Sequence, residues 1–442
     1  MLRRQLLGLA CAQGTNFAGI YKHLIFGNAS VRTKVAGRVC NIAEFGAVGD
    51  ALSNDAGAFR AALLALGKNG GGVLTLEKRS YRIVVGARDG SIVVGTGITI
   101  VGNGAKLIVD FSSEDIPAWD GRFINIVGDG VSLENLSIYR LNTSGKCVII
   151  TIGGNSNIKM KNVHIDGAVT REGEAYCHAL QFGQAGYLRN LEFVGCSFSN
   201  LDYSILMTNN SRGIVDGLKF LGCSFMRNWA DDIGLNSPRG SIRNVSISKC
   251  SFKDNRSAIA SGGFAVALAH VSGVDIEGCQ VSGYGNEGVH IEDYSSNVRI
   301  TGNTLERCGL SRGAFIRIMS GSSDIYISNN SFVGADNPSI NIVEALTGGG
   351  GMTPGGRLAI PPINVVIDGN EFGSGFCKYY IYIELMANYQ ITNNRFSCKG
   401  GDVLNPKPRT FSEIFLFKSN SGILGGNITC DERRNGVVIL RK

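Results

Sequence analysis

Three aspartates in two short segments of the chain are candidates for acid–base chemistry. Asp202 ends the segment Asn200-Leu201-Asp202, and Asp231 and Asp232 are adjacent. Glycoside hydrolysis needs two carboxyl groups, one that protonates the leaving oxygen and one that activates water or attacks the sugar. Crowding of carboxylates raises the pKa of one of them, which keeps an acid available near neutral pH. The sequence therefore predicts Asp202, Asp231 and Asp232 as catalytic residues of a hydrolase.

Polar residues in later segments could extend this site. His290 and Arg317 stand between apolar neighbours, and Asn236 and Glu292 each follow an apolar residue. Alternation along a strand points every second side chain to the same side. We predict His290 as a further catalytic residue and the other three as substrate ligands in an outward groove. The residues predicted on this outward face are Asp232, Asn236, His290, Glu292, Arg317, Asn341 and Glu384.

A purely structural role is an alternative for each of these groups. Adjacent aspartates are typical of tight turns, where their side chains accept hydrogen bonds from backbone N–H groups. His290 and Glu292 could form an exposed polar pair, and Arg317 could form a surface ion pair with Glu292 and Asp324.

The elements that must position these residues belong to a repeat. Leu191–Phe198, Leu218–Phe225 and Val245–Phe252 share the pattern apolar-x-apolar-x-x-small-x-apolar, and its sixth residue recurs at intervals of 24 to 40 residues. Intervals in this range indicate a solenoid. The predicted sixth residues are Asn103, Leu136, Val163, Cys196, Cys223, Cys250, Cys279, Asn303, Asn330, Asn370, Asn394 and Asn427.

The repeat predicts an all-β fold, a single-stranded parallel β-helix of about 11–12 coils. Apolar residues alternate as in strands, turn residues fill the gaps, and no repeat contains a helical run. Stacking places like residues on one another about 4.8 Å apart. The asparagines at the sixth position would then form an amide ladder, and the cysteines would form a column of buried free thiols. A right-handed coil is the default handedness.

One amphipathic helix is predicted over residues 53–67, because Phe59, Ala62, Leu63 and Leu66 recur at helical spacing. A helix at this place could cover the open end of the coil, which would otherwise expose apolar residues and strand edges.

The order of these segments resembles the N-terminal signature of the pectate-lyase-like superfamily. The resemblance rests on residues 41–50 (NIAEFGAVGD), the predicted helix, and residues 70–83 (GGGVLTLEKRSYRI), and it extends over about 41–430. Phage tailspikes and polygalacturonase-type enzymes are members. The resemblance implies a right-handed parallel β-helix with an N-terminal capping helix, and a polysaccharide partner.

The candidate site resembles that of polygalacturonases. Asn200-Leu201-Asp202 is similar to their Asn-Thr-Asp motif, Asp231-Asp232 to their Asp-Asp motif, and Arg317-Ile318 to the start of their Arg-Ile-Lys motif. His290 could stand for the histidine of their Gly-His-Gly motif.

By this resemblance Asp232 would be the general acid, Asp202 and Asp231 would hold the water, and Arg317 would bind a substrate carboxylate. The chain departs from the pattern at Met319, which stands where the family has lysine. His290 lacks the flanking glycines. A related glycan hydrolase therefore fits better than a polygalacturonase.

Composition bounds the organisation of the chain. Of 442 residues, 44% are hydrophobic, which is enough for one continuous core in an elongated domain. We predict a leader or attachment segment over 1–40, the β-helix domain over 41–430 and a C-terminal tail over 431–442. Residues 1–14 are faintly similar to a signal peptide, and the location predicted is a virion or the extracellular space. No apolar run suggests a membrane span.

The net charge of the chain indicates the chemical class of its partner. The net charge of +7 favours an acidic polysaccharide, whereas the chain lacks the basic runs with interleaved aromatic residues that favour nucleic acid. A homotrimer is the assembly known from tailspikes.

Three functions remain open at this stage. The first is a glycoside hydrolase, as in a phage or prophage tailspike depolymerase, which needs no cofactor or metal. The second is a polysaccharide lyase or epimerase, with His290 or Arg317 as base and a calcium ion held by Asp231, Asp232 and Glu292. The third is a glycan-binding spike without catalysis.

Overall fold

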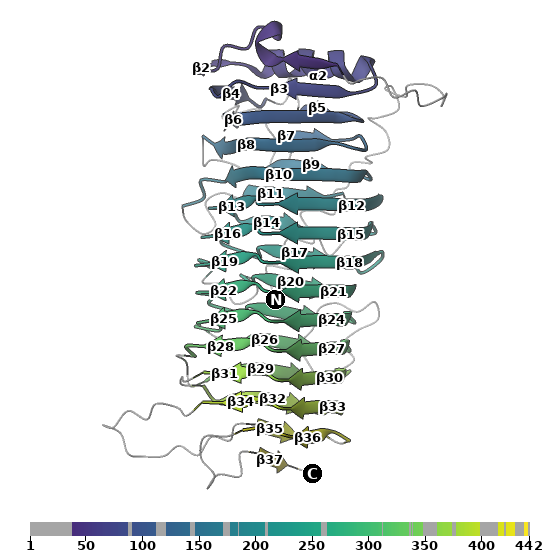
Figure 1. Ribbon diagram of the computed structural model, residues 1–442, viewed down its shortest axis with the longest axis vertical. Coiled ribbons are helices and arrows are strands. Elements are labelled where there is room, and N and C mark those ends of the chain that lie inside the picture. The colour runs from purple at the N-terminus through teal and green to yellow at the C-terminus, as the bar shows by residue number, and fades with distance from the viewer. Residues whose placement is uncertain are drawn as a thin grey trace, which may run out of the picture.

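The computed structural model is a long stack of parallel coils with one α-helix at its N-terminal end among the described residues (Figure 1). The structure describes residues 38–86, 91–111, 121–141, 146–170, 177–183, 185–207, 211–257, 263–311, 313–335, 337, 339–347, 360–373, 377–397, 414–419, 421–428 and 437–440. The predicted leader-like segment 1–14 lies outside these residues.

A complete coil carries three strands on three faces, as in β15 (Ile214–Leu221), β16 (Ser224–Met226) and β17 (Ile233–Asn236). The fold is an all-β, right-handed parallel β-helix, as predicted.

Strands of the first face are β1 (Val39–Asn41), β3 (Gly72–Thr75), β12 (Tyr187–Val194), β15, β18 (Ser241–Ser248), β21 (Val271–Glu277), β24 (Ser296–Thr301), β27 (Ser323–Ser328), β30 (Ile363–Asp368), β33 (Ala387–Thr392) and β36 (Ile423–Gly425). The second face has β2 (Asp50–Asn54), β4 (Ser80–Val84), β13 (Ser197–Ser199), β16, β19 (Ser251–Lys253), β22 (Gln280–Ser282), β25 (Thr304–Glu306), β28 (Ser331–Val333), β31 (Glu371–Phe372) and β34 (Arg395–Phe396). Three long strands run through both faces: β6 (Ile98–Asp110), β8 (Ser132–Arg140) and β10 (Ser156–Asp166).

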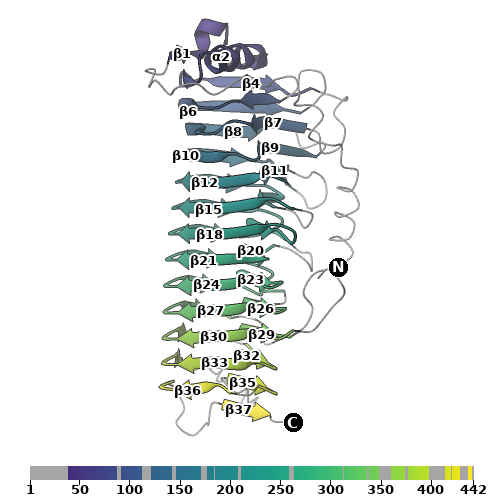
Figure 2. The same ribbon diagram turned by 90° about the vertical axis from the view of Figure 1, so that its right-hand side faces the viewer.

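The third face is a separate parallel sheet of 13 described strands. They are β5 (Ile92–Val94), β7 (Gly121–Ile126), β9 (Cys147–Ile152), β11 (Cys177–Phe182), β14 (Tyr203–Leu206), β17, β20 (Val266–Ala269), β23 (Val289–Glu292), β26 (Ala314–Met319), β29 (Asn341–Leu346), β32 (Tyr379–Glu384), β35 (Ile414–Phe417) and β37 (Val437–Leu440). Figure 2 shows β20, β23, β26, β29 and β32 as successive rungs.

Left-handed residues bend the chain both within the first-face strands and between faces, which explains the breaks in the apolar alternation. In one coil Gly217, Gly222 and Arg227 have φ of 82°, 60° and 57°. A glycine reaches this region without steric strain. Asn244 and Lys249 take the first two of these places in the next coil, with φ of 58° and 53°.

The predicted asparagine and cysteine columns are present in the core, and a column of phenylalanine rings accompanies them. Phe198, Phe225 and Phe252 stack with ring centroids 5.1 and 4.7 Å apart. Cys196, Cys223, Cys250 and Cys279 are buried free thiols. Asn303 donates through Nδ2 to Oδ1 of Asn330 at 3.0 Å, and Asn330 donates to Asn370 in the same way.

The first predicted rung is wrong. Leu136 pairs with Ala105 and not with Asn103, because the register of β6 shifts between Val101 and Ala105. Asn103 instead donates to the carbonyl oxygen of Leu76 at 3.0 Å.

The capping helix is α2 (Ala56–Lys68), and a short 3-10 helix, η1 (Ile42–Phe45), precedes it. Phe59, Ala62, Leu63 and Leu66 of α2 are buried against the end of the coil, as their spacing predicts. The Phe59 ring contacts Tyr81 edge-on at 5.9 Å. Figure 1 shows α2 across the top of the stack.

Strand pairing extends to both ends of the described chain. β1 begins at Val39, within the predicted segment 1–40, and β37 pairs with β35 within the predicted tail 431–442. None of the described helices combines the length and the apolar character needed to cross a membrane.

Candidate functional site

Outward side chains of the third face form a charged cluster over neighbouring coils. Register pairs His290 of β23 with Arg317 of β26, and Arg317 with Glu344 of β29. Their strand neighbours Ile291 and Ile318 point inward and are buried. A regular apolar strand therefore presents each charged group at the same outward position, one coil after another. We call His290, Glu287, Glu292, Arg317 and Glu344 the acidic cluster.

His290 lies between two carboxylates. Its Nδ1 is 3.7 Å from Glu287 and its Nε2 is 3.3 Å from Glu292, while its ring stacks on Phe264 at 4.5 Å. Burial opposes protonation of the imidazole, but the two glutamates outweigh it and raise the pKa of His290 to about 9. The side chain is therefore a cation at neutral pH.

Arg317 joins two glutamates that titrate differently. Its Nη1 lies 2.5 Å from Glu287, and its Nε bonds to Glu344. Burial alone would raise the pKa of Glu287, but His290 and Arg317 hold it below its ordinary value. Burial raises the pKa of Glu344, against the opposing effect of Arg317 and of Asn341, whose Nδ2 donates to it at 2.7 Å.

The arrangement is suited to acid–base chemistry. Environments that push two carboxyl pKa values apart supply one group that stays protonated and one that stays ionised. Glu287 and Glu344 share one guanidinium, so their carboxyl groups are close neighbours. Arg317 is 25% exposed and both glutamates are nearly buried, so the guanidinium is the part of this pair that meets solvent. Buried titratable groups with specific charge partners are typical of functional sites.

Asp202 and Asp231 lie on adjacent coils, as predicted, but outside this cluster. Asp202 Oδ2 is 3.6 Å from Nε2 of His178. Asp231 accepts hydrogen bonds through Oδ1 from the backbone N–H groups of Gly263 and Phe264, at 2.9 and 3.2 Å. The two side chains thus contact different coils, and the bonds of Asp231 agree with the turn-stabilising alternative.

Asp232 does not face outward, and this prediction is wrong. Its carboxylate accepts hydrogen bonds from Asn228 and from the hydroxyl of the buried Tyr284. The strand begins at a corner of the coil, where residue 232 points inward despite the alternation of the residues that follow. Burial raises the pKa of Asp232 to about 7.

Asp232→Asn is expected to flatten the dependence of stability on pH. Because the folded-state pKa lies above the unfolded value of 3.8, the protonated carboxyl stabilises the fold fully below that value. This stabilisation is lost as pH rises through about 7, by a few kcal/mol. The asparagine side chain of the variant does not titrate, so this pH-dependent change in stability is absent. Urea unfolding from pH 4 to 8 tests this, and an unchanged pH profile would contradict it.

The remaining predicted residues divide into two groups. The structure brings His290, Glu292 and Arg317 together, although Arg317 pairs with Glu287 and Glu344 and not with Glu292 or Asp324. Asn236 lies apart, two coils from Glu292 by register, and its Oδ1 is 3.2 Å from Nδ1 of His270.

Sequence reasoning missed Glu287 and Glu344. Aligning Ser339–Val343 with Phe315–Met319 placed Asn341 opposite Arg317, whereas the structure pairs Arg317 with Glu344, three residues later. Glu287 lies in the turn before β23, where no alternation identifies its direction. Pairing the apolar run Ile342–Val343 with Phe315–Ile316 could have found Glu344.

The described residues contain no group of three or more His, Cys, Asp or Glu side chains placed to hold a metal ion. The predicted calcium ligands do not converge, since Asp232 is turned into the core, Asp231 binds backbone N–H groups and Glu292 contacts His290.

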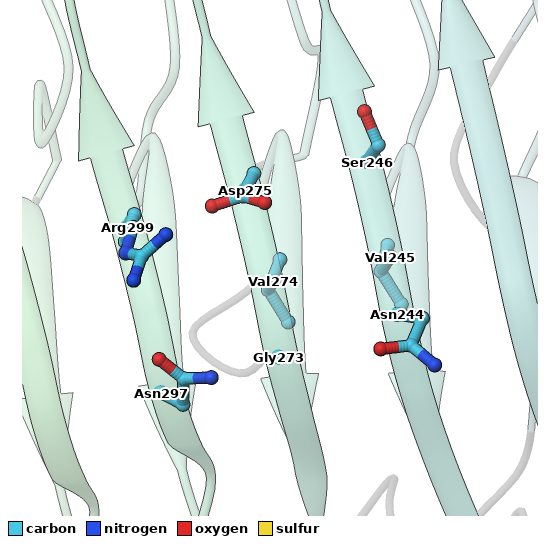
Figure 3. A pocket seen from close by; sticks show the side chains of 8 residues that line it. All are labelled: Asn244, Val245, Ser246, Gly273, Val274, Asp275, Asn297 and Arg299. Carbon is cyan, nitrogen blue, oxygen red and sulfur yellow. The ribbon is translucent and has the colours of Figure 1, made fainter.

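A shallow hollow also lies on the first face. Figure 3 shows Asn244, Asp275, Asn297 and Arg299 around it, on β18, β21 and β24. It lies on a different sheet from the acidic cluster.

Comparisons with known proteins agree with this architecture. The family model described as a right handed beta helix region matches residues 179–349, which include the whole acidic cluster. A curated relative, Alginate lyase 7 of Azotobacter vinelandii, is 32% identical over 90 residues. That match covers 20% of this chain and about a tenth of the relative's length.

Solved structures share the fold at low identity. The A-module of the mannuronan C-5 epimerase AlgE6 of Azotobacter vinelandii is 15% identical, with a TM-score of 0.56 over 88% of this chain and 99% of the module. The surface adhesin PfbA of Streptococcus pneumoniae is 13% identical, with a TM-score of 0.52 over 88% of this chain and 91% of the adhesin. A tailspike of the E. coli bacteriophage HK620, in complex with a pentasaccharide, is 14% identical, with a TM-score of 0.50 over 90% of this chain and 66% of the tailspike.

Proposed function

The chain has the right-handed parallel β-helix fold of the pectate-lyase-like superfamily, and from this premise we propose that it is a glycoside hydrolase acting on an acidic polysaccharide. The observation that carries the proposal is the contact of Arg317 with two buried carboxyl groups, Glu287 and Glu344. Their surroundings displace the pKa of Glu287 downward and that of Glu344 upward. Hydrolysis of a glycosidic bond requires such a pair, with carboxyl groups about 5 to 9 Å apart.

In this proposal Glu344 donates its proton to the leaving oxygen. Glu287, which stays ionised, activates a water molecule or attacks the sugar directly. Arg317 holds the two carboxyl groups in place through its bonds to both. His290 and Arg317 are cations, and together with the net charge of +7 they favour a uronate or another acidic sugar.

The similarity to a phage tailspike and to a surface adhesin supports a virion or extracellular location and a role as a depolymerase of surface or capsular glycan. A homotrimer remains a prediction from the resemblance to tailspikes.

A polysaccharide lyase or epimerase is the second candidate. The match to Alginate lyase 7 and the shared fold with a mannuronan C-5 epimerase favour it. The ionised Glu287 could take the proton next to a uronate carboxylate, while Arg317 and His290 neutralise that carboxylate.

Incubation with a panel of acidic and neutral polysaccharides, followed by mass spectrometry and proton NMR of the products, separates these candidates. Hydrolysis adds one water per bond cleaved. A lyase produces a new ultraviolet-absorbing double bond, and an epimerase changes sugar configuration without shortening the chain. Hydrolysis products from an acidic glycan are the expected result. Glycan binding without any chemical change would instead support the non-catalytic spike.

A further inference from the structure

Three aromatic rings form a stacked group on the third face, beyond the acidic cluster. Tyr379 and Tyr382 of β32 lie 5.9 Å apart, and Phe415 of β35 lies 4.7 Å from Tyr379 and 5.5 Å from Tyr382. The interplanar angles are 24°, 25° and 4°. The rings are therefore close to parallel and stack on one another across two coils. We call these three rings the aromatic platform.

The platform faces outward and is partly exposed. Tyr382 and Phe415 alternate with Ile381, Ile383 and Leu416, which are buried at 1% exposure or less. Rings on this side add nothing to the packed interior of the coil. Partly exposed rings of this size offer a large rigid contact area at low entropic cost.

Register makes the platform continuous with the acidic cluster. Arg317 pairs with Glu344, Glu344 with Tyr382, and Tyr382 with Phe415. In the neighbouring column, Asn341 pairs with Tyr379. One strand step is about 4.8 Å, close to the length of one sugar unit. A glycan chain lying along the coil axis over Glu344 would thus place its next units over the rings.

Charge at the platform agrees with an acidic glycan. Nζ of Lys378 lies 5.5 Å from the centre of the Tyr379 ring. A sugar ring carries C–H bonds on its faces, which pack on aromatic rings, and charged substituents at its edge, which an ammonium group can meet.

We propose that Tyr379, Tyr382 and Phe415 form a subsite that binds a pyranose unit of the polysaccharide cleaved at Glu344. This inference rests on the proposed function and extends it, because it assigns one end of the substrate to the C-terminal coils. The subsite contributes binding and no chemistry.

Affinity electrophoresis tests the subsite. The gels contain the intact form of the polysaccharide that the unmodified protein cleaves in the panel. Glu344→Gln serves as the parent protein, so that the glycan is not consumed during the run. Tyr382→Leu and Phe415→Leu are each expected to weaken binding about tenfold, and Tyr382→Phe, which keeps the ring, by less than twofold. Tyr326→Leu, a partly exposed tyrosine on β27 of the first face, is the matched control and should bind normally.

Kinetics in the protein with Glu344 intact give an independent readout. The two leucine variants should raise KM for long chains and leave kcat unchanged. Thermal melts identify any variant that fails to fold. If one leucine variant fails to fold, the binding of the other leucine variant tests the subsite. Normal binding by both leucine variants, with cleavage intact, would overturn the subsite alone. A protein that neither binds nor cleaves any glycan would overturn the proposed function as well. Loss of binding to another protein, with glycan binding unchanged, would assign the rings to a protein partner and overturn the subsite.

Discussion

Glu344→Gln is expected to reduce the rate of polysaccharide cleavage by about 10²- to 10⁴-fold, the contribution of one well-placed general acid. Glutamine has the same shape but carries no transferable proton. Arg317 can still donate to its amide oxygen, and a flipped Asn341 amide can accept from its nitrogen, so the fold should be retained. The measurement is the initial rate of appearance of reducing ends.

The pH dependence of the cleavage rate provides a second test of Glu344. Because the pKa of Glu344 is raised, activity that depends on its proton should fall as pH rises through that pKa. The residual activity of Glu344→Gln should lack this fall. Glu371→Gln, an exposed glutamate on β31 of the second face, is the control and should cleave at the normal rate. A Glu344→Gln protein that keeps more than a third of the normal rate would remove Glu344 from the mechanism.

Asn330→Ala is expected to lower the free energy of unfolding by about 2 to 4 kcal/mol, since its amide serves three buried partners at once. Its Nδ2 donates to the carbonyl oxygen of Ile300 at 2.8 Å and to Asn370 at 3.0 Å. Its Oδ1 accepts from the backbone N–H of Asn303 at 2.9 Å. Alanine removes all of these side-chain bonds, although Oδ1 of Asn370 keeps the backbone N–H of residue 330 as a donor.

Asn427→Ala at the end of the same ladder provides the comparison. Its Nδ2 donates to Ile391 and its Oδ1 accepts from Asn394, but it is partly exposed, so water can replace these bonds. Chemical denaturation should show a loss of less than about 1 kcal/mol for this variant. Equal losses for the two asparagines would argue against burial as the reason for the effect.

The sequence alone was sufficient for the architecture, because a solenoid is built from contacts between neighbouring repeats. Cys196, Cys223 and Cys250 recur at one position of the repeat, and only stacking of the coils brings such residues into one buried column. The capping helix also followed from the sequence, because the spacing of apolar residues from Phe59 to Leu66 is a property of that segment alone. His290, Glu292 and Arg317 followed from the alternation within their own strands.

The tertiary structure alone decided which carboxylates meet. Asp232 turned inward because a corner of the coil overrides the alternation, and corner geometry depends on backbone angles that the residue pattern does not reveal. Glu344 reached Arg317 because β29 pairs with β26 in a register three residues away from the one that the residue pattern suggests. Glu287 lies in a turn, whose direction is set by contacts between coils and not by its own sequence. Local pattern thus determines a coil, whereas a charged site depends on the relative placement of several coils.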